Sequence, residues 1–316
     1  MSGCLVQSGF GTVGNFEFVY PNPTAGLDHY WCDNDDPARP WHHSGTFGQG
    51  LGQVGRDRGW ASMIYSSYGN LEVVVVVGGS LYYLSRDESG WQEPTPLSDG
   101  VTGVPGFVQR RVGENFEVVV PLDGGGMVHL TRDNGDPAQP WSWGSVFGAE
   151  QGEMDSVSLI ESHLGPGGDN LELVALATQD GALHHYWGEY GDVAADNPTV
   201  SRPVSWSGPE GVPFADGVPS LFQGTFGQPG NFELVVSDNE QGGLIHFYRD
   251  NGAEGFPWPQ PGTAFGDRVD YGVPSLIEST SAHLEVLVYD RDASALVQFS
   301  RNGNGEWSGR GIVAKL

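Results

Sequence analysis

The chain has 316 residues, of which 38% are hydrophobic, and a formal net charge of −26. A surface this acidic repels nucleic-acid phosphates and anionic lipids, so we expect neither as a primary partner. No apolar run approaches the roughly 20 residues of a membrane span, so we also expect no membrane insertion.

The first residues, Met-Ser-Gly-Cys-Leu-Val, lack a basic segment followed by a long apolar one. They are therefore not a secretory signal, and we expect a cytoplasmic protein as synthesised, with later release left open. Cys4 and Cys32 fall on the first and third predicted strands of one unit, about 9.6 Å apart. Because that separation is too large for a disulfide, we expect two free thiols, which a reducing compartment would tolerate.

A unit of four short predicted strands recurs along the chain. Its first strand is an apolar pair followed by a polar residue, as in Leu5-Val6-Gln7 and Leu276-Ile277-Glu278. Its second strand begins with the phrase Asn-x-Glu, or His-x-Glu in the last copy, and successive glutamates lie about 50 residues apart. These six glutamates are Glu17, Glu72, Glu117, Glu172, Glu233 and Glu285.

The third strand of each unit follows a Gly-rich turn and carries a polar residue at one fixed position. That position holds His29, Tyr83, His129, His185, His246 and Gln298. The fourth segment of each unit contains a tryptophan, and these are Trp41, Trp91, Trp141, Trp206, Trp258 and Trp307.

Four short strands per roughly 50 residues, joined by tight turns, are the period of a β-propeller blade. We therefore predict an all-β protein with one propeller domain over residues 1–316 and with the first strand of each blade innermost. Its six four-stranded blades should span about 1–59, 60–103, 104–154, 155–216, 217–271 and 272–316. A pair of β-sandwiches is the alternative, but sandwiches need not repeat one phrase six times.

The repeats alternate in a way that indicates three copies of a two-blade module. Blades one, three and five have Phe in the Asn-x-Glu phrase, whereas the even blades have Leu. The odd blades also share a long loop that runs from an Asp-Asn pair to a Pro-Trp pair and is followed by Phe-Gly. These loops span 33–41, 133–141 and 250–258.

Three groups of phrases in the first unit have echoes over essentially the whole chain. They are Gly14-Asn15-Phe16-Glu17, His29-Tyr30-Trp31 with Asp33-Asn34-Asp35, and Pro40-Trp41 with Thr46-Phe47-Gly48. In these phrases the chain resembles the Photorhabdus-type propeller lectins. The resemblance implies carbohydrate binding at sites between neighbouring blades, with fucose and related or methylated sugars favoured.

The odd-blade loops are the candidate sugar sites. A tryptophan offers a platform for the C–H face of a sugar, while Asp, Asn and His supply hydrogen-bonding groups for its hydroxyls. The predicted site residues are Trp41, Asp33, Asn34 and His29; Trp141, Asp133, Asn134 and His129; and Trp258, Asp250, Asn251 and His246. The alternatives are that the tryptophans fill gaps between blades and that the histidines form hydrogen bonds between blades.

Other recurring groups fit a structural role better. The Asn-x-Glu glutamate recurs in every unit, so we expect it to accept hydrogen bonds from the backbone or from a third-strand arginine. The segment from Ser85 to Trp91 superficially resembles a sialidase Asp box, but its Gly-to-Trp spacing differs from that motif. One histidine per blade is no compact ligand set, so we expect no metal and no cofactor.

The sequence favours a multivalent, non-catalytic lectin that binds glycans or glycoconjugates. A propeller glycosidase or another hydrolase is the enzyme alternative, although the even spread of motifs argues against one privileged catalytic centre. A protein-interaction platform is the third class, and oligomers are left open.

Overall fold

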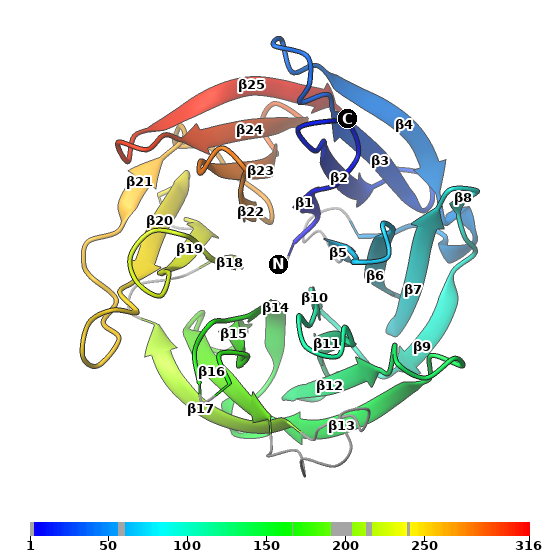
Figure 1. Ribbon diagram of the computed structural model, residues 1–316, viewed down its shortest axis with the longest axis vertical. Coiled ribbons are helices and arrows are strands. Elements are labelled where there is room, and N and C mark those ends of the chain that lie inside the picture. Colours follow the sequence, from blue (N-terminus) through cyan, green and yellow to red (C-terminus); the bar gives the residue numbers. More distant parts are fainter. Residues whose placement is uncertain (1–2, 56–60, 166, 191–203, 213–216, 239–240) are drawn as a thin grey trace.

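The computed structural model describes residues 3–55, 61–165, 167–190, 204–212, 217–238 and 241–316. Six antiparallel sheets follow one another along the chain and form a closed ring (Figure 1). The predicted six-bladed β-propeller is therefore confirmed. The predicted start at residue 1 and the boundaries at 59, 60 and 216 lie outside the described residues.

The first three blades carry the following elements. Blade 1 has β1 (Leu5–Gln7), β2 (Phe16–Pro21), β3 (Leu27–Cys32) and β4 (Trp41–Phe47), followed by the short 3-10 helix η1 (Gln49–Leu51). Blade 2 has β5 (Ala61–Tyr65), β6 (Leu71–Val77), β7 (Ser80–Asp87), β8 (Gly90–Trp91) and β9 (Thr95–Asp99). Blade 3 has β10 (Gly106–Gln109), β11 (Phe116–Pro121), β12 (Met127–Arg132) and β13 (Trp141–Phe147), followed by η2 (Ala149–Gln151).

The last three blades repeat this order. Blade 4 has β14 (Met154–Glu161), β15 (Leu171–Ala177), β16 (Leu183–Tyr190) and β17 (Val204–Val212). Blade 5 has β18 (Pro219–Gln223), β19 (Phe232–Ser237), β20 (Leu244–Arg249) and β21 (Thr263–Phe265). Blade 6 has β22 (Ser275–Glu278), β23 (Leu284–Asp290), β24 (Ala295–Arg301) and β25 (Trp307–Lys315).

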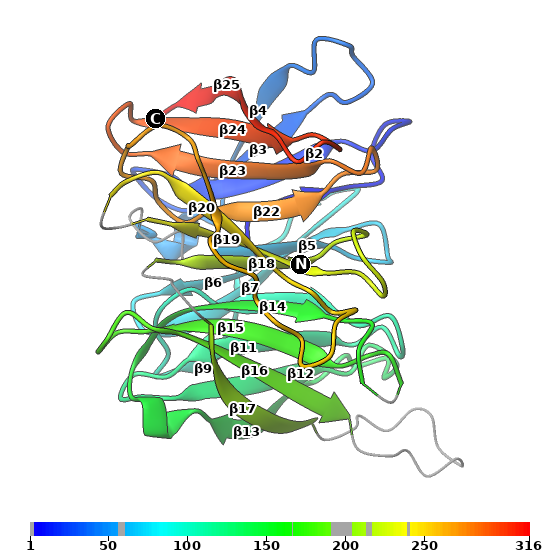
Figure 2. The same cartoon turned by 90° about the vertical axis from the view of Figure 1, so that its left-hand side faces the viewer.

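The first strand of every blade lies nearest the centre of the ring (Figure 1), as predicted. The other strands follow outward in chain order, and the edge-on view shows β22 to β25 as successive layers (Figure 2). Blade 2 differs in its outer strand, because β8 and β9 each pair with a different part of β7.

The second strands form the core because neighbouring blades cover both of their faces. In β11, for example, all six residues of Phe-Glu-Val-Val-Val-Pro are buried. A strand covered on both sides has a continuous apolar run instead of alternating apolar and polar residues. Consistent with this, one buried cluster joins Val174 of blade 4 to Phe232 of blade 5.

The polar residue that ends each inner strand joins adjacent blades. The Gln109 side chain accepts a hydrogen bond from the backbone N–H of Ser67 in blade 2 at 2.7 Å. Equivalent bonds run from Arg111 to Glu161, His163 to Gln223, Thr225 to Glu278 and Thr280 to Gln7. Between blades 1 and 2 the ring of Tyr65 packs edge-on against Phe10 instead. The last residue of the recurring apolar-apolar-polar phrase therefore connects neighbouring blades.

Candidate functional site

Each Asn-x-Glu glutamate forms a buried hydrogen-bonded pair with the polar residue of the third strand in its own blade. His29 Nε2 lies 2.8 Å from Glu17 Oε2, and the Tyr83 hydroxyl donates to Glu72 at 2.6 Å. The other pairs are His129–Glu117, His185–Glu172, His246–Glu233 and Gln298–Glu285. The glutamate was expected to bond to the backbone or to an arginine, but its partner here is the polar residue of the third strand. This bond joins two strands of one blade and not two neighbouring blades.

The even-blade tryptophans stack on the phenylalanines of the odd-blade Phe-Gly pairs. The ring centroids of Trp91 and Phe47 are 3.7 Å apart, and their ring planes differ by 5°. The same kind of stack joins Trp206 to Phe147 and Trp307 to Phe265. Each of these tryptophans also meets an odd-blade histidine edge-on, with His29 5.6 Å from Trp91. The alternation of odd and even repeats in the sequence therefore corresponds to one kind of odd–even interface, which occurs three times in the structure.

The odd-blade tryptophans lie at the other kind of interface, between an even blade and the following odd blade. Trp41 Nε1 donates to Gln298 Oε1 of blade 6 at 3.1 Å. Trp141 meets Tyr83 of blade 2 edge-on at 5.7 Å, and Trp258 packs against the cluster between blades 4 and 5. Blade 1 consequently separates Trp41 from His29, which faces blade 2.

The aspartates of the odd-blade loops form turns within the loops. Asp33 Oδ1 accepts hydrogen bonds from the backbone N–H groups of Asp35 and Asp36. Asp133 and Asp250 accept equivalent bonds from Gly135 and Gly252. These three carboxylates therefore hold the loop conformation in this structure.

The asparagines that follow these aspartates orient an arginine. The Asn34 side chain donates to the Gly14 carbonyl at 2.7 Å and accepts from Arg39 Nε at 3.1 Å. In blades 3 and 5, Asn134 and Asn251 accept in the same way from Arg132 Nε and Arg249 Nε.

The oriented arginine lies over the phenylalanine of the Asn-x-Glu phrase. Its guanidinium carbon is 3.9 Å from the Phe116 ring centre for Arg132 and 4.0 Å from Phe232 for Arg249. In blade 1 the equivalent third-strand position holds Cys32, and Arg39 from the loop takes over, 4.9 Å from Phe16. The sequence contains a signal for this role of Arg39, because blade 1 keeps the loop asparagine but lacks the third-strand arginine.

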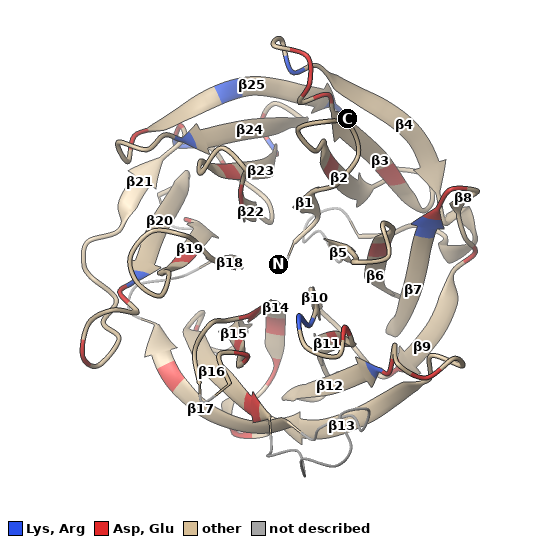
Figure 3. Cartoon of the chain, viewed as in Figure 1, with Lys and Arg blue, Asp and Glu red and all other residues tan. Residues whose placement is uncertain are grey.

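These arginines reach toward the glutamate pair of the preceding blade. Arg132 Nη1 donates to the Tyr83 hydroxyl at 2.7 Å, and Arg39 Nη1 lies 3.9 Å from Glu285 Oε1. Burial raises the pKa of Glu72 and of Glu285, while the nearby arginine opposes that shift in each case. Figure 3 shows basic residues on β7, β12, β20 and β24, within a chain dominated by acidic groups.

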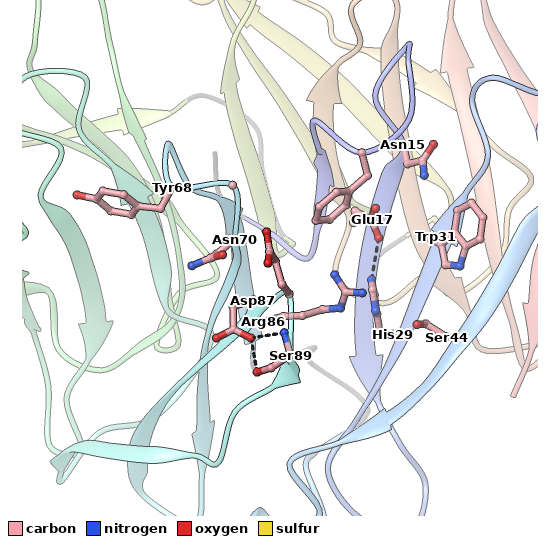
Figure 4. A pocket seen from close by; sticks show the side chains of 13 residues that line it. Asn15, Glu17, His29, Trp31, Ser44, Tyr68, Asn70, Arg86, Asp87 and Ser89 are labelled. Carbon is pink, nitrogen blue, oxygen red and sulfur yellow. Dashed lines mark hydrogen bonds and ion pairs between the residues drawn. The ribbon is translucent and has the colours of Figure 1, made fainter.

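The crevice between blades 1 and 2 holds a cavity of about 940 Å³. Glu17, His29 and Trp31 line it from blade 1, and Arg86 reaches in from blade 2 (Figure 4). Phe10 also lines it, with the Arg86 guanidinium carbon 5.5 Å from its ring centre. A buried acceptor pair, a cationic donor and aromatic faces thus meet in one cavity.

Similar crevices with smaller cavities lie between other blades. Between blades 6 and 1 a cavity of about 460 Å³ is lined by Arg39, Trp41 and Gln298. Between blades 4 and 5 a cavity of about 390 Å³ is lined by Glu172, Trp187 and Arg249.

Between blades 3 and 4 the chain fills the equivalent position itself. The Tyr190 hydroxyl donates to Glu117 Oε1 at 3.4 Å, where other crevices have an arginine. Arg110 lies 3.3 Å above the Tyr190 ring and pairs with Asp169 at 3.1 Å.

Of the candidate residues, His29 lines the first cavity and Trp41 lines the second. His129 and His246 occupy the positions equivalent to His29, and Trp141 and Trp258 those equivalent to Trp41. The loop arginine Arg39 was not among the predicted site residues, and neither were Trp31 and Phe10. Cys4, just before β1, and Cys32, on β3, are buried free thiols.

The described residues contain neither a metal-ligand cluster nor a membrane-spanning helix. Among the described residues, no cluster of three or more His, Cys, Asp or Glu side chains is arranged to hold a metal ion. No helix in the described part of the chain is long and apolar enough to cross a membrane.

No protein-family model matches the chain, and no curated protein matches its sequence significantly. Solved structures do match. The BP39L lectin from Burkholderia pseudomallei is 14% identical, with a TM-score of 0.66 and 97% of each chain covered. A fungal lectin from Aleuria aurantia, described as a six-bladed β-propeller with a novel fucose recognition mode, is 16% identical, with a TM-score of 0.63, and 96% of this chain and 92% of that chain are covered.

The chain has the fold of these propeller lectins. The SapL1 lectin, solved with α-methyl fucoside, shares it at 13% identity and a TM-score of 0.67, with 99% of this chain and 96% of that chain covered. A protein of unknown function from Dyadobacter fermentans shares it as well, at 11% identity and a TM-score of 0.65, with 92% and 90% covered. At these identities the likeness concerns the propeller-lectin fold, and the Photorhabdus-type resemblance stays a prediction.

Proposed function

We propose that this protein is a multivalent, non-catalytic lectin whose sugar sites are crevices between neighbouring blades. The observation that carries the proposal is the cavity between blades 1 and 2. There Glu17 and Arg86 offer an acceptor and a donor for sugar hydroxyls, and Trp31 and Phe10 offer aromatic faces. Sugar sites in proteins combine such fixed polar groups with apolar surfaces.

Fucose-like or methylated monosaccharides are the proposed ligands. Support comes from the Photorhabdus-type resemblance and from the SapL1 and Aleuria aurantia lectins, whose structures are described with a fucoside or with fucose recognition. A 6-deoxy or methylated sugar presents an apolar group as well as hydroxyls, which suits a cavity with both aromatic and charged walls.

Two sets of crevices remain as proposed sites. The odd–even set contains His29 and His246, together with His129, whose crevice Tyr190 fills in this structure. The even–odd set contains the loop tryptophans Trp41, Trp141 and Trp258. The loop residues Asp33, Asn34, Asp133, Asn134, Asp250 and Asn251 support the even–odd set, because they hold the loops and orient Arg39, Arg132 and Arg249.

A glycan array followed by calorimetry tests this function. We expect wild-type protein to bind fucosylated glycans, and methyl α-L-fucoside to bind with millimolar to micromolar affinity, about −4 to −8 kcal/mol per site. Arg86→Ala and Trp31→Ala should each remove one site. Arg268→Ala is the matched control, since Arg268 is an exposed arginine outside the three inter-blade cavities.

Three results would contradict the proposal. They are an array without glycan binding, an Arg86→Ala and Trp31→Ala double variant with the full wild-type stoichiometry, and hydrolysis of aryl glycosides by the purified protein. The last result would favour the glycosidase alternative, while capture of a protein ligand through these crevices would favour an interaction platform.

A further inference from the structure

The crevice between blades 6 and 1 differs in charge from those between blades 1 and 2 and between blades 4 and 5. Two arginines, Arg39 and Arg310, line its cavity, and no acidic residue does. The crevice between blades 1 and 2 instead has Glu17, Asp87 and Glu88 against the single cation Arg86. That between blades 4 and 5 is likewise acidic, with Glu172, Glu189 and Glu210 against Arg249.

Arg39 is held in a fixed position. Asn34 accepts from its Nε at 3.1 Å, and the Phe16 ring lies 4.9 Å below its guanidinium carbon. Its Nη1 is 3.9 Å from Glu285 Oε1, while 34% of its side chain remains exposed. A prepositioned, partly exposed guanidinium can bind a ligand anion with little further loss of side-chain entropy.

Arg310 supplies the second cation from β25. Its Nη2 donates to the Ser300 hydroxyl at 3.3 Å. Both Arg310 and Arg39 act on the buried Glu285, whose raised pKa they oppose. Two guanidinium groups therefore line this cavity, and the one carboxylate that they act on, Glu285, is buried behind it.

The acidic side chains of the neighbouring loop are engaged elsewhere. Asp35 accepts from the backbone N–H groups of Thr12 and Val13, both at 2.7 Å. Asp36 accepts from the backbone N–H of Ala38 at 2.8 Å. Asp33 likewise accepts bonds from the loop backbone, and none of the three aspartates lines the cavity, whose charged wall therefore consists of the two arginines.

We propose that this crevice binds an anionic saccharide, whose carboxylate or sulfate lies between Arg39 and Arg310. The Trp41 ring forms the apolar wall for the sugar. Guanidinium groups bind planar carboxylates and sulfates through paired, charge-assisted hydrogen bonds. The inference rests on the proposed lectin function and assigns a ligand class to one crevice, while the acidic crevices take neutral sugars.

Calorimetry with two matched sugars tests the inference. Methyl α-D-galacturonide and methyl α-D-galactoside differ only at C6, where one carries a carboxylate and the other a CH₂OH group. We expect the galacturonide to bind about tenfold more tightly to wild-type protein at low salt. Galactose 6-sulfate is the second anionic probe and distinguishes a sulfate from a carboxylate preference.

Arg310→Gln isolates the charge. Glutamine removes the charge but keeps a polar amide, and Arg310 is exposed, so the fold should persist. We expect the variant to lose the tenfold anionic preference and to keep its fucoside binding in the crevices between blades 1 and 2 and between blades 4 and 5, which Arg310 does not line. Arg268→Gln, which removes an exposed cation outside the crevice, should keep both. High salt should also weaken galacturonide binding far more than fucoside binding.

The two proposals fail in different ways. Neutral sugar binding without any anionic preference, or an anionic preference that survives in Arg310→Gln, would overturn the inference alone. An absence of binding to every sugar, neutral and anionic, would overturn the lectin proposal as well.

Discussion

A buried glutamate in each blade has one fixed partner position but not one fixed partner. The partner is histidine in four blades, tyrosine in blade 2 and glutamine in blade 6. All three residue types can donate a hydrogen bond, and an unpaired buried carboxylate would be costly. The requirement for a donor therefore explains why the position is polar without being invariant.

Replacing Glu117 tests this structural role. Glu117 Oε2 accepts from His129 at 2.8 Å and from the Thr131 hydroxyl at 2.6 Å. Glu117→Ala leaves those buried donors without an acceptor, so we expect a loss of about 1–3 kcal/mol in the free energy of unfolding. Chemical denaturation measures it, and glycan binding per folded molecule should fall less.

The control is Glu150→Ala, which removes an exposed carboxylate from η2 and should leave the unfolding free energy unchanged. Wild-type stability of Glu117→Ala combined with abolished sugar binding would reverse the assignment and make this glutamate a ligand-binding group.

At the scale of the element, the propeller uses two alternating interfaces. Odd–even interfaces stack a tryptophan flat on a phenylalanine, as Trp91 does on Phe47. Even–odd interfaces use the long loop, the arginine that the loop asparagine orients, and an odd-blade tryptophan such as Trp41. The Phe-Gly pairs that follow the long loops therefore serve one interface, while the loops serve the other.

Substituting the two sets of tryptophans separates their roles. Trp41→Ala, Trp141→Ala and Trp258→Ala should lower the sugar stoichiometry stepwise in calorimetry, and the triple variant should stay folded and keep only the sites of the odd–even crevices. The equivalent triple variant at Trp91, Trp206 and Trp307 should instead lose stability, by about 3–5 kcal/mol per site, because each substitution removes a packed ring.

Circular dichroism during thermal unfolding checks the folding half of this prediction. If the first triple variant binds sugar as wild type does, the odd-blade tryptophans are packing residues alone. The odd-blade site assignment would then be wrong.

At the scale of the whole molecule, blades 6 and 1 close the ring without exchanging a strand, since each sheet is built from one continuous stretch of chain. Gln7 and Thr280 exchange two hydrogen bonds across this seam, at 2.8 and 3.1 Å. The backbone N–H of Cys4, next to β1, donates to Ser275 Oγ of β22 at 2.9 Å, and both strands lie near the centre of the ring (Figure 1). The crevices therefore lie at fixed positions around one closed ring.

This arrangement should give avidity on a glycan-covered surface. Linked sites on one rigid body can raise apparent affinity by about 10²–10⁴ over a single site. We expect surface plasmon resonance to show much tighter binding at high than at low density of immobilised fucoside. Equal affinity at both densities would mean that only one crevice binds. A surface without immobilised sugar serves as the reference.

The fold could be predicted from the sequence alone. Six copies of one phrase determine the number of blades, and the need of each segment to pair its backbone hydrogen bonds within a blade determines the strands. The sequence also determined the two-blade module, since the Phe/Leu alternation separates odd blades, whose phenylalanine lies under an arginine as Phe16 lies under Arg39, from even blades, whose Leu71 packs in an apolar cluster. These features are local and periodic, and a periodic pattern can be read without knowing which blades touch.

Only the tertiary structure decided which residues share a crevice. Residues predicted to share one site proved to face different neighbours, so Trp41 meets blade 6 while His29 meets blade 2. The packing of Arg39 on Phe16, in place of the arginine missing at Cys32, and the position of Arg39 and Arg310 in one cavity across the ring closure depend on residues far apart in the chain. Such contacts carry no sequence period, because they are set by how blades pack rather than by how each strand forms.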